Sequence, residues 1–121
     1  AQNNLGVRFE QGLGVPQNYV AAIHWYTLAA MQEDATGQYN LGVMYENGLG
    51  VVQDYSTAAK WYALASDQGH SDAQNNLGNL FYEGQGVHQN DTEALRWIEL
   101  AAAQGNTQAL ANLEKIKSTM N

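Results

Sequence analysis

One eleven-residue stretch occurs three times in this chain. It spans residues 5–15, 41–51 and 77–87, and its middle copy reads Leu-Gly-Val-Met-Tyr-Glu-Asn-Gly-Leu-Gly-Val. The copies are 36 residues apart, and Trp25, Trp61 and Trp97 keep the same spacing outside the stretch. A fixed period of this length is typical of a solenoid, in which each repeat is one structural unit that stacks on its neighbours.

Each repeat is expected to form two helices. In the first helix of the middle repeat, Leu41 and Tyr45 lie four residues apart on one face. That helix should end at Gly48, since glycine suits the left-handed position just past a helix end. The second helix should begin at Asp54, whose side chain can accept from exposed amides of the first turn. Its apolar residues cover more than half of its circumference, so we expect neighbours on several sides and an all-α fold.

The period divides the chain into a single solenoid domain, residues 1–121. Repeat 1 is expected at about residues 1–34, repeat 2 at 35–70, repeat 3 at 71–106 and a capping helix at 107–120. In the last segment Glu114 stands where the other copies have a mid-helix glycine, and Lys117 stands where they have an aromatic residue. Charges at contact positions stop further stacking, which predicts a cap. Because the chain starts inside a repeat and without methionine, we expect that it is a fragment of a longer protein.

Two further expectations concern contacts between helices. Gly6, Gly42 and Gly78 lie mid-helix, where glycine costs about 1 kcal/mol against alanine, and this predicts the close approach of a neighbouring aromatic ring. Glu33 replaces the glycine that ends the second helix in the later copies, and Gly37 replaces an alanine. The junction between them is therefore predicted to be the least regular and most mobile in the chain.

Charge narrows the classes of partner. Twelve acidic residues against five basic ones give a formal charge of −7, and binding to nucleic acid or to an anionic membrane needs a positive surface. No apolar run is long enough for membrane insertion. We therefore expect no nucleic acid and no membrane insertion, and predict another protein or peptide, neutral or basic, as the partner.

The repeated motifs identify a family. Leu77-Gly78, Phe81, Gly84-Gln85-Gly86-Val87, Ala58-Ala59-Lys60-Trp61-Tyr62 and Gln68-Gly69 together resemble the Sel1-like repeat family, which is related to the tetratricopeptide repeats. The resemblance implies a right-handed alpha-alpha solenoid with a C-terminal capping helix, whose first helices line a concave groove. It also implies an adaptor that assembles protein complexes, often bacterial and often exported to the periplasm or secreted. One cysteine-rich branch of the family has been linked to β-lactams, and this chain has no cysteine.

If this orientation holds, first-helix positions that do not face the core form the groove. The predicted partner-binding residues are Asn4, Val7, Glu10, Tyr39, Asn40, Val43, Glu46, Asn47, Asp72, Asn75, Asn76, Asn79, Tyr82 and Glu83. Asn4, Asn40, Asn76 and Asn112 recur as a ladder of amides that could bind a peptide backbone or serve a structural role. Tyr39 and Tyr82 offer stacking surface. The acidic members favour a partner with lysine or arginine, so binding should weaken with salt and on Glu46→Lys.

Catalysis and metal binding are not predicted. Glu10 and Glu46 could form an acid and base pair, but their recurrence follows from the repeat, and nothing in the sequence pushes their pKa values apart. His24, His70 and His88 lack metal-ligand spacing and are interpreted as surface residues. The tryptophans are interpreted as core, with a sugar-binding row as the alternative. The prediction is a scaffold with no cofactor; the alternatives are a binder or hydrolase of cell-wall or β-lactam ligands, and a structural C-terminal portion of a longer array.

Overall fold

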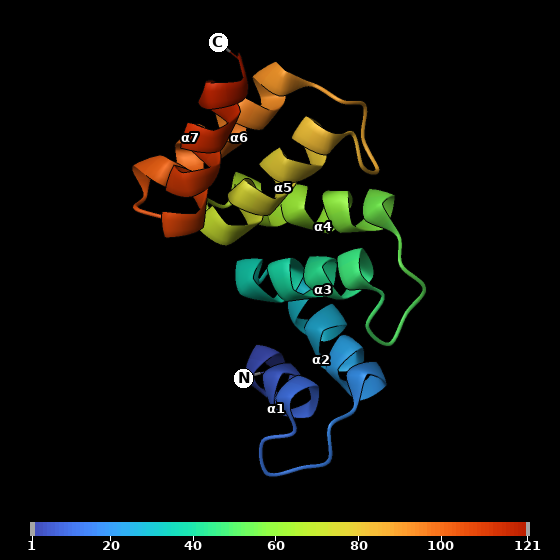
Figure 1. Cartoon of the computed structure of the whole chain (residues 1–121). Helices are drawn as coiled ribbons and strands as arrows, with labels where there is room; N and C mark the ends of the chain where they lie inside the picture. Colours follow the sequence, from blue (N-terminus) through green and yellow to red (C-terminus); the bar gives the residue numbers. More distant parts are fainter. Residues whose placement is uncertain (1, 121) are drawn as a thin grey trace.

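The computed structural model describes residues 2–120, so the predicted start of repeat 1 at Ala1 lies outside the described residues. The helices are α1 (Gln2–Gln11), α2 (Tyr19–Met31), α3 (Ala35–Asn47), α4 (Tyr55–Asp67), α5 (Ser71–Glu83), α6 (Asp91–Ala103) and α7 (Thr107–Met120). Residues 2–120 contain no strand, which agrees with the all-α prediction. Figure 1 shows the helices following one another along the stack, with the two chain ends at opposite ends of it.

Local sequence sets the helix ends as predicted. Asn18, Asp54 and Asn90 are the N-caps of α2, α4 and α6, and each side chain accepts from a backbone amide three residues on, at 3.0, 3.2 and 3.1 Å. Gly48 and Gly84 end α3 and α5 with a φ of 68°, the left-handed conformation that glycine adopts most easily. Each repeat is therefore a pair of helices with defined ends.

The core lies between the helix pairs. Ala22, Ala58 and Ala94 of the second helices are fully buried. A β-carbon at Gly42 would lie 2.7 Å from the Tyr62 ring, and one at Gly6 would lie 2.5 Å from the Tyr26 ring, so the predicted close approach of an aromatic is confirmed at both sites.

The same prediction is wrong for the third repeat. There a β-carbon at Gly78 would meet Ile98 at 2.5 Å, because Ile98 takes the place that Tyr26 and Tyr62 have in the other copies. The small residue is still required by a close helix contact, but the group that approaches it is aliphatic.

The junction before α3 is regular in geometry. The amide of Asp34 donates to the carbonyl of Ala29 at 3.1 Å, as His70 does to Ala65 in the next repeat. Glu33 adopts a φ of 65°, so it keeps the left-handed conformation although it is not glycine. Gly37 packs so closely on Ala29 that a β-carbon there would lie 2.7 Å away. The prediction of an irregular junction is therefore wrong, and its mobility stays a prediction.

Helix α7 packs on the last helix pair. Ala109 and Ile116 are buried against Ile98 and Ala101 of α6, while Glu114 and Lys117 are exposed. The charged residues that replace the glycine and aromatic columns thus face away from the core. None of the helices described by the structure is long and apolar enough to cross a membrane.

Candidate functional site

The first helices of the repeats face one another along one side of the solenoid, which we call the inner face. Asn40 on α3 donates from Nδ2 to Oδ1 of Asn3 on α1 at 2.8 Å, and Asn112 on α7 donates to Asn75 on α5 at 2.9 Å. These bonds link first helices of successive repeats directly. The inner face is therefore built from α1, α3, α5 and α7.

The predicted amide ladder is largely a structural feature. Besides Asn40 and Asn112, Asn76 donates from Nδ2 to the Tyr62 hydroxyl at 3.4 Å. Asn4 is exposed. Three of the four amides thus donate hydrogen bonds to neighbouring helices. This favours a structural role for the amide ladder over binding of a peptide backbone.

The prediction that Asn75 lines the partner-binding groove is wrong. Only 2% of its surface is exposed, because α7 packs over this part of α5 and Asn112 donates to its side-chain oxygen. Asn75 therefore cannot line a partner-binding groove. Val7 and Val43 are half-buried and pack against the core clusters, whereas Asn47 is exposed.

Tyr39 lies in the field of three carboxylates from successive first helices. Burial raises the pKa of Tyr39, and the negative charges of Asp72, Glu46 and Glu10 raise that pKa further. The Tyr39 ring stacks on His70, with centroids 4.8 Å apart and planes at 23°. The predicted residues Glu10, Glu46 and Asp72 thus act on one point of the inner face, where the field is negative.

Glu10 and Glu46 also have a structural role. The buried hydroxyls of Tyr26 and Tyr62 donate to Oε1 of Glu10 and Glu46 respectively, each at 2.5 Å. Burial raises the pKa of both tyrosines, and the bonded carboxylate raises it further.

Sequence reasoning missed these pairs, although an internal comparison could have found them. Repeat 3 has Tyr82 at the glutamate position and Ile98 at the tyrosine position, so both partners change together. Because Glu46 bonds Tyr62, Glu46→Lys would alter folding as well as charge, and it is a poor test of binding.

The end of the inner face near α7 is more covered. Tyr82 is half-buried, and its hydroxyl lies 3.1 Å from the Thr119 hydroxyl of α7. Asn79, Tyr82 and Glu83 line a cavity of about 110 Å³ together with Asn112, Lys115 and Ile116. Lys115 of α7 therefore brings a positive charge beside Glu83, whereas the predicted groove residues include no lysine or arginine.

A polar recess lies beside Tyr39. It has a volume of about 370 Å³ and is lined by Tyr39, Asp72, Gly105, Asn106, Thr107 and Gln108. Within it, Asn106 donates from Nδ2 to Oδ1 of Asp72 at 2.7 Å. The recess offers a carboxylate and an aromatic ring to a polar or cationic side chain.

The histidines and tryptophans differ from one another in environment. His24 and His88 are exposed as predicted, but His70 is half-buried: its Nδ1 accepts from the Ala73 amide at 3.2 Å as the N-cap of α5. The interpretation of His70 as a surface residue is therefore wrong. Trp97 is 8% exposed in a core cluster. Within residues 2–120 there is no group of three His, Cys, Asp or Glu side chains that could hold a metal ion.

Solved structures share this architecture. A Sel1 repeat protein from Oxalobacter formigenes is 41% identical, with a TM-score of 0.88 over 93% of this chain and 46% of that one. A protective antigen present in uropathogenic Escherichia coli strains, which displays an SLR fold, is 39% identical, with a TM-score of 0.94 over 98% of this chain and 25% of that one. Cysteine rich protein B of Helicobacter pylori is 26% identical, with a TM-score of 0.77 over 91% of this chain and 90% of that one.

The chain spans about half the length of the first of these proteins and a quarter of the second. No curated protein matches the chain. The Sel1 repeat model matches residues 1–34, 35–70 and 71–106, which together cover most of the sequence. The chain therefore belongs to the Sel1 repeat family.

Proposed function

We propose that this chain is a non-enzymatic scaffold whose inner face binds an extended, neutral or basic segment of another protein. Proteins with Sel1 repeats generally act as protein-interaction scaffolds, which supports the general class. The observation that carries the finer proposal is the polar recess lined by Tyr39 and Asp72, to whose surroundings Glu46 and Glu10 add negative charge. A lysine or arginine side chain placed there would meet the Asp72 carboxylate beside the Tyr39 ring, in a region where Glu46 and Glu10 add negative charge.

The proposed partner site is the part of the inner face around Tyr39. It comprises Asn4, Glu10, Tyr39, Asn40, Glu46, Asn47, Asp72 and Asn76, and extends to Asn79, Tyr82 and Glu83. The polar recess beside Tyr39 supports this choice, because it provides depth for a side chain next to Asp72. Toward α7 the positive charge of Lys115 reduces the attraction for a basic segment.

Removing charge without removing hydrogen-bond acceptors tests the proposal. In the double variant Glu46→Gln/Asp72→Asn, the amide oxygens can still accept from Tyr62 and Asn106. We expect a fluorescent peptide of alternating lysine and alanine to bind about three- to tenfold more weakly, since each exposed ion pair contributes about 0.2–1 kcal/mol. Fluorescence anisotropy measures the affinity. Added salt should weaken binding to the unmodified chain, because it shortens the range of electrostatic attraction.

A control with the same change in net charge separates local from general attraction. Asp67 and Glu99 are exposed on the second helices α4 and α6, so Asp67→Asn/Glu99→Gln removes two charges away from the inner face. This variant should bind the lysine peptide as the unmodified chain does. Salt-insensitive binding, equal loss in both double variants, or equally strong binding of a glutamate and alanine peptide would contradict the proposal.

A further inference from the structure

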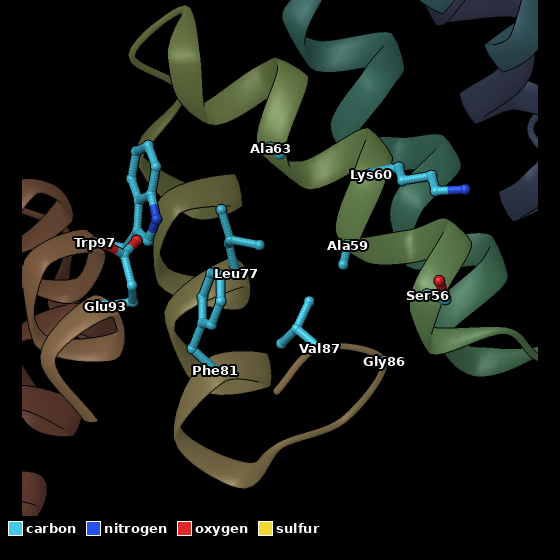
Figure 2. Close-up of a pocket in the computed structure, with 10 residues that line it drawn as sticks. All are labelled: Ser56, Ala59, Lys60, Ala63, Leu77, Phe81, Gly86, Val87, Glu93 and Trp97. Atoms are coloured by element: carbon cyan, nitrogen blue, oxygen red, sulfur yellow. The ribbon is translucent and has the colours of Figure 1, made fainter. Parts of the chain in front are cut away.

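An apolar recess lies on the side of the second helices, between α4 and α6. We call it the outer pocket; its volume is about 380 Å³. Figure 2 shows Ala59 and Ala63 of α4 on one side and Trp97 of α6 on the other, with Leu77, Phe81 and Val87 between them. Its size is within the range of protein ligand pockets, about 300–1,000 Å³.

A small residue of the middle repeat, Ala59, helps to explain why the pocket is open. At the position of Ala59, repeat 1 has Ile23 and repeat 3 has Leu95. Ile23 reaches the loop of the next repeat, since a β-carbon at Gly50 would lie 3.1 Å from its Cδ1. The shorter Ala59 cannot span this gap. Part of the pocket is therefore the space that a branched aliphatic side chain, Ile23, fills in repeat 1.

Charges near the outer pocket differ from those of the inner face. Lys60 and Glu93 both line the pocket, and the Arg96 guanidinium carbon lies 4.4 Å from the centroid of the Trp97 ring. Arg96 pairs with Glu93 at 3.2 Å. Lys60 is in no ion pair among residues 2–120. The pKa of Asp54 is lowered mainly by hydrogen bonds from Thr57, and the charge of Lys60 lowers it slightly further. In Figure 2 its ammonium group points away from the pocket centre, so it is available beside the pocket.

We propose that the outer pocket is a docking site for one leucine- or isoleucine-sized side chain of a partner protein, in a segment that carries a carboxylate beside it. The aliphatic side chain restores the packing that Ile23 gives in repeat 1, and the carboxylate pairs with Lys60. This site is separate from the proposed partner site on the inner face, and of its two charged lining residues Glu93 is paired with Arg96 while Lys60 is in no ion pair among residues 2–120. The chain would then hold two partner segments of different chemistry on its two sides.

The indole signals of the three tryptophans provide a local readout. The probe is the blocked peptide Glu-Leu-Glu, titrated into isotope-labelled protein and followed by NMR. We expect the Trp97 indole N–H signal to shift with peptide concentration, while the Trp25 and Trp61 signals stay in place. The blocked peptide Glu-Ala-Glu should give little shift, because it leaves the pocket unfilled. Equal shifts with both peptides, or equal shifts at all three tryptophans, would overturn the proposal.

A variant that fills the pocket with a larger side chain of the chain itself gives the decisive test. Ala59→Ile introduces the residue that repeat 1 accommodates at the same position, so it should fold and should abolish the Trp97 shift. If it does not fold, Ala63→Thr, which introduces the repeat 1 residue Thr27, should reduce the shift instead. A filled variant that folds and still shows the full Trp97 shift would overturn the proposal.

Two lysine variants test whether Lys60 pairs with a carboxylate of the peptide. Lys60→Gln should weaken Glu-Leu-Glu binding by about two- to fivefold, as expected for one exposed ion pair. Lys115→Gln removes the same charge on α7, far along the chain from the pocket, and should leave the affinity unchanged. Equal effects of the two variants would overturn the role of Lys60. A Trp97 shift with octanoate but not with the peptide would assign the pocket to a small amphiphile and overturn docking of a protein segment.

Discussion

Asp34, His70 and Asn106 occupy the same position in the repeat, and each caps the first helix that follows it. Asp34 accepts from Thr36 at 3.0 Å, His70 Nδ1 accepts from Ala73 at 3.2 Å and Asn106 accepts from Ala109 at 2.9 Å. Asp and Asn are common caps, whereas histidine can accept only while Nδ1 carries no proton. The cap of α5 is therefore the one among these three that protonation near neutral pH can remove.

This position predicts a pH dependence of stability. Burial lowers the pKa of His70, although the nearby Asp72 and Asp34 oppose that shift. An unfolded histidine has a pKa of about 6.5, so the neutral cap stabilises the fold above that value and the contribution is lost as pH falls through the lower folded pKa. We expect urea unfolding at pH 5 to show a loss of about 1 kcal/mol relative to pH 7, the usual contribution of a cap. In His70→Asn, which copies Asn106, that part of the loss should disappear.

His24→Asn is the control for this prediction. His24 is exposed within α2 and caps no helix, so its replacement should leave the pH dependence as it is in the unmodified chain. If His70→Asn and the unmodified chain lose the same stability between pH 7 and 5, the cap is not the cause.

Individual positions also show how far the sequence could lead. The caps Asn18, Asp54 and Asn90 were predictable, because a short polar side chain before an apolar helix has a local physical role. The burial of Asn75 was not predictable. Tyr39 has the same position in the previous repeat, and only the packing of α7 on α5 buries Asn75. The Glu46–Tyr62 bond was missed because a glutamate on a helix surface is usually solvated, and only a neighbouring helix decides otherwise.

At the scale of helices, the mid-helix glycines set how closely each pair packs. The ring of Tyr62 on α4 lies directly against Gly42 on α3, where α3 has no side chain. The same ring carries the hydroxyl that bonds Glu46, so the close approach also positions a carboxylate of the inner face. Packing in the core and charge on the surface are therefore connected through one tyrosine.

The substitution Gly42→Ala tests this close packing, because the sign of its effect on the free energy of unfolding depends on the contact with Tyr62. In an ordinary helix interior this substitution gains about 1 kcal/mol. Here the added methyl group would lie 2.7 Å from the Tyr62 ring, so we expect a loss of about 1–3 kcal/mol, typical of an overfilled core. Chemical denaturation measures the free energy of unfolding. The control is Thr36→Ala on the exposed side of α3, which should change the free energy of unfolding little. A Gly42→Ala variant that is more stable than the unmodified chain would show that the helices can move apart without cost.

At the scale of the whole molecule, each helix packs chiefly on the helices next to it in sequence, with an added contact between α5 and α7. Such an array has no single centre, and its stability is close to a sum of repeat and neighbour contributions. The period in the sequence predicted this architecture well, because it records which surfaces must match from copy to copy. It could not predict the outer pocket, which arises where one copy departs from the others at Ala59.

The neighbour-by-neighbour architecture predicts a local response to damage at one end. Ile116 of α7 is 3% exposed and packs with Ile98 and Ala101, so Ile116→Ala should cost about 2–5 kcal/mol of local stability. Native-state hydrogen exchange should then show faster exchange in α5, α6 and α7, with little change in α1 and α2, since their contacts do not include α7. Lys117→Ala, an exposed change one residue away, should leave all helices protected. Equal acceleration from α1 to α7 would mean that the repeats open as one unit, and that the two proposed binding surfaces are coupled through it.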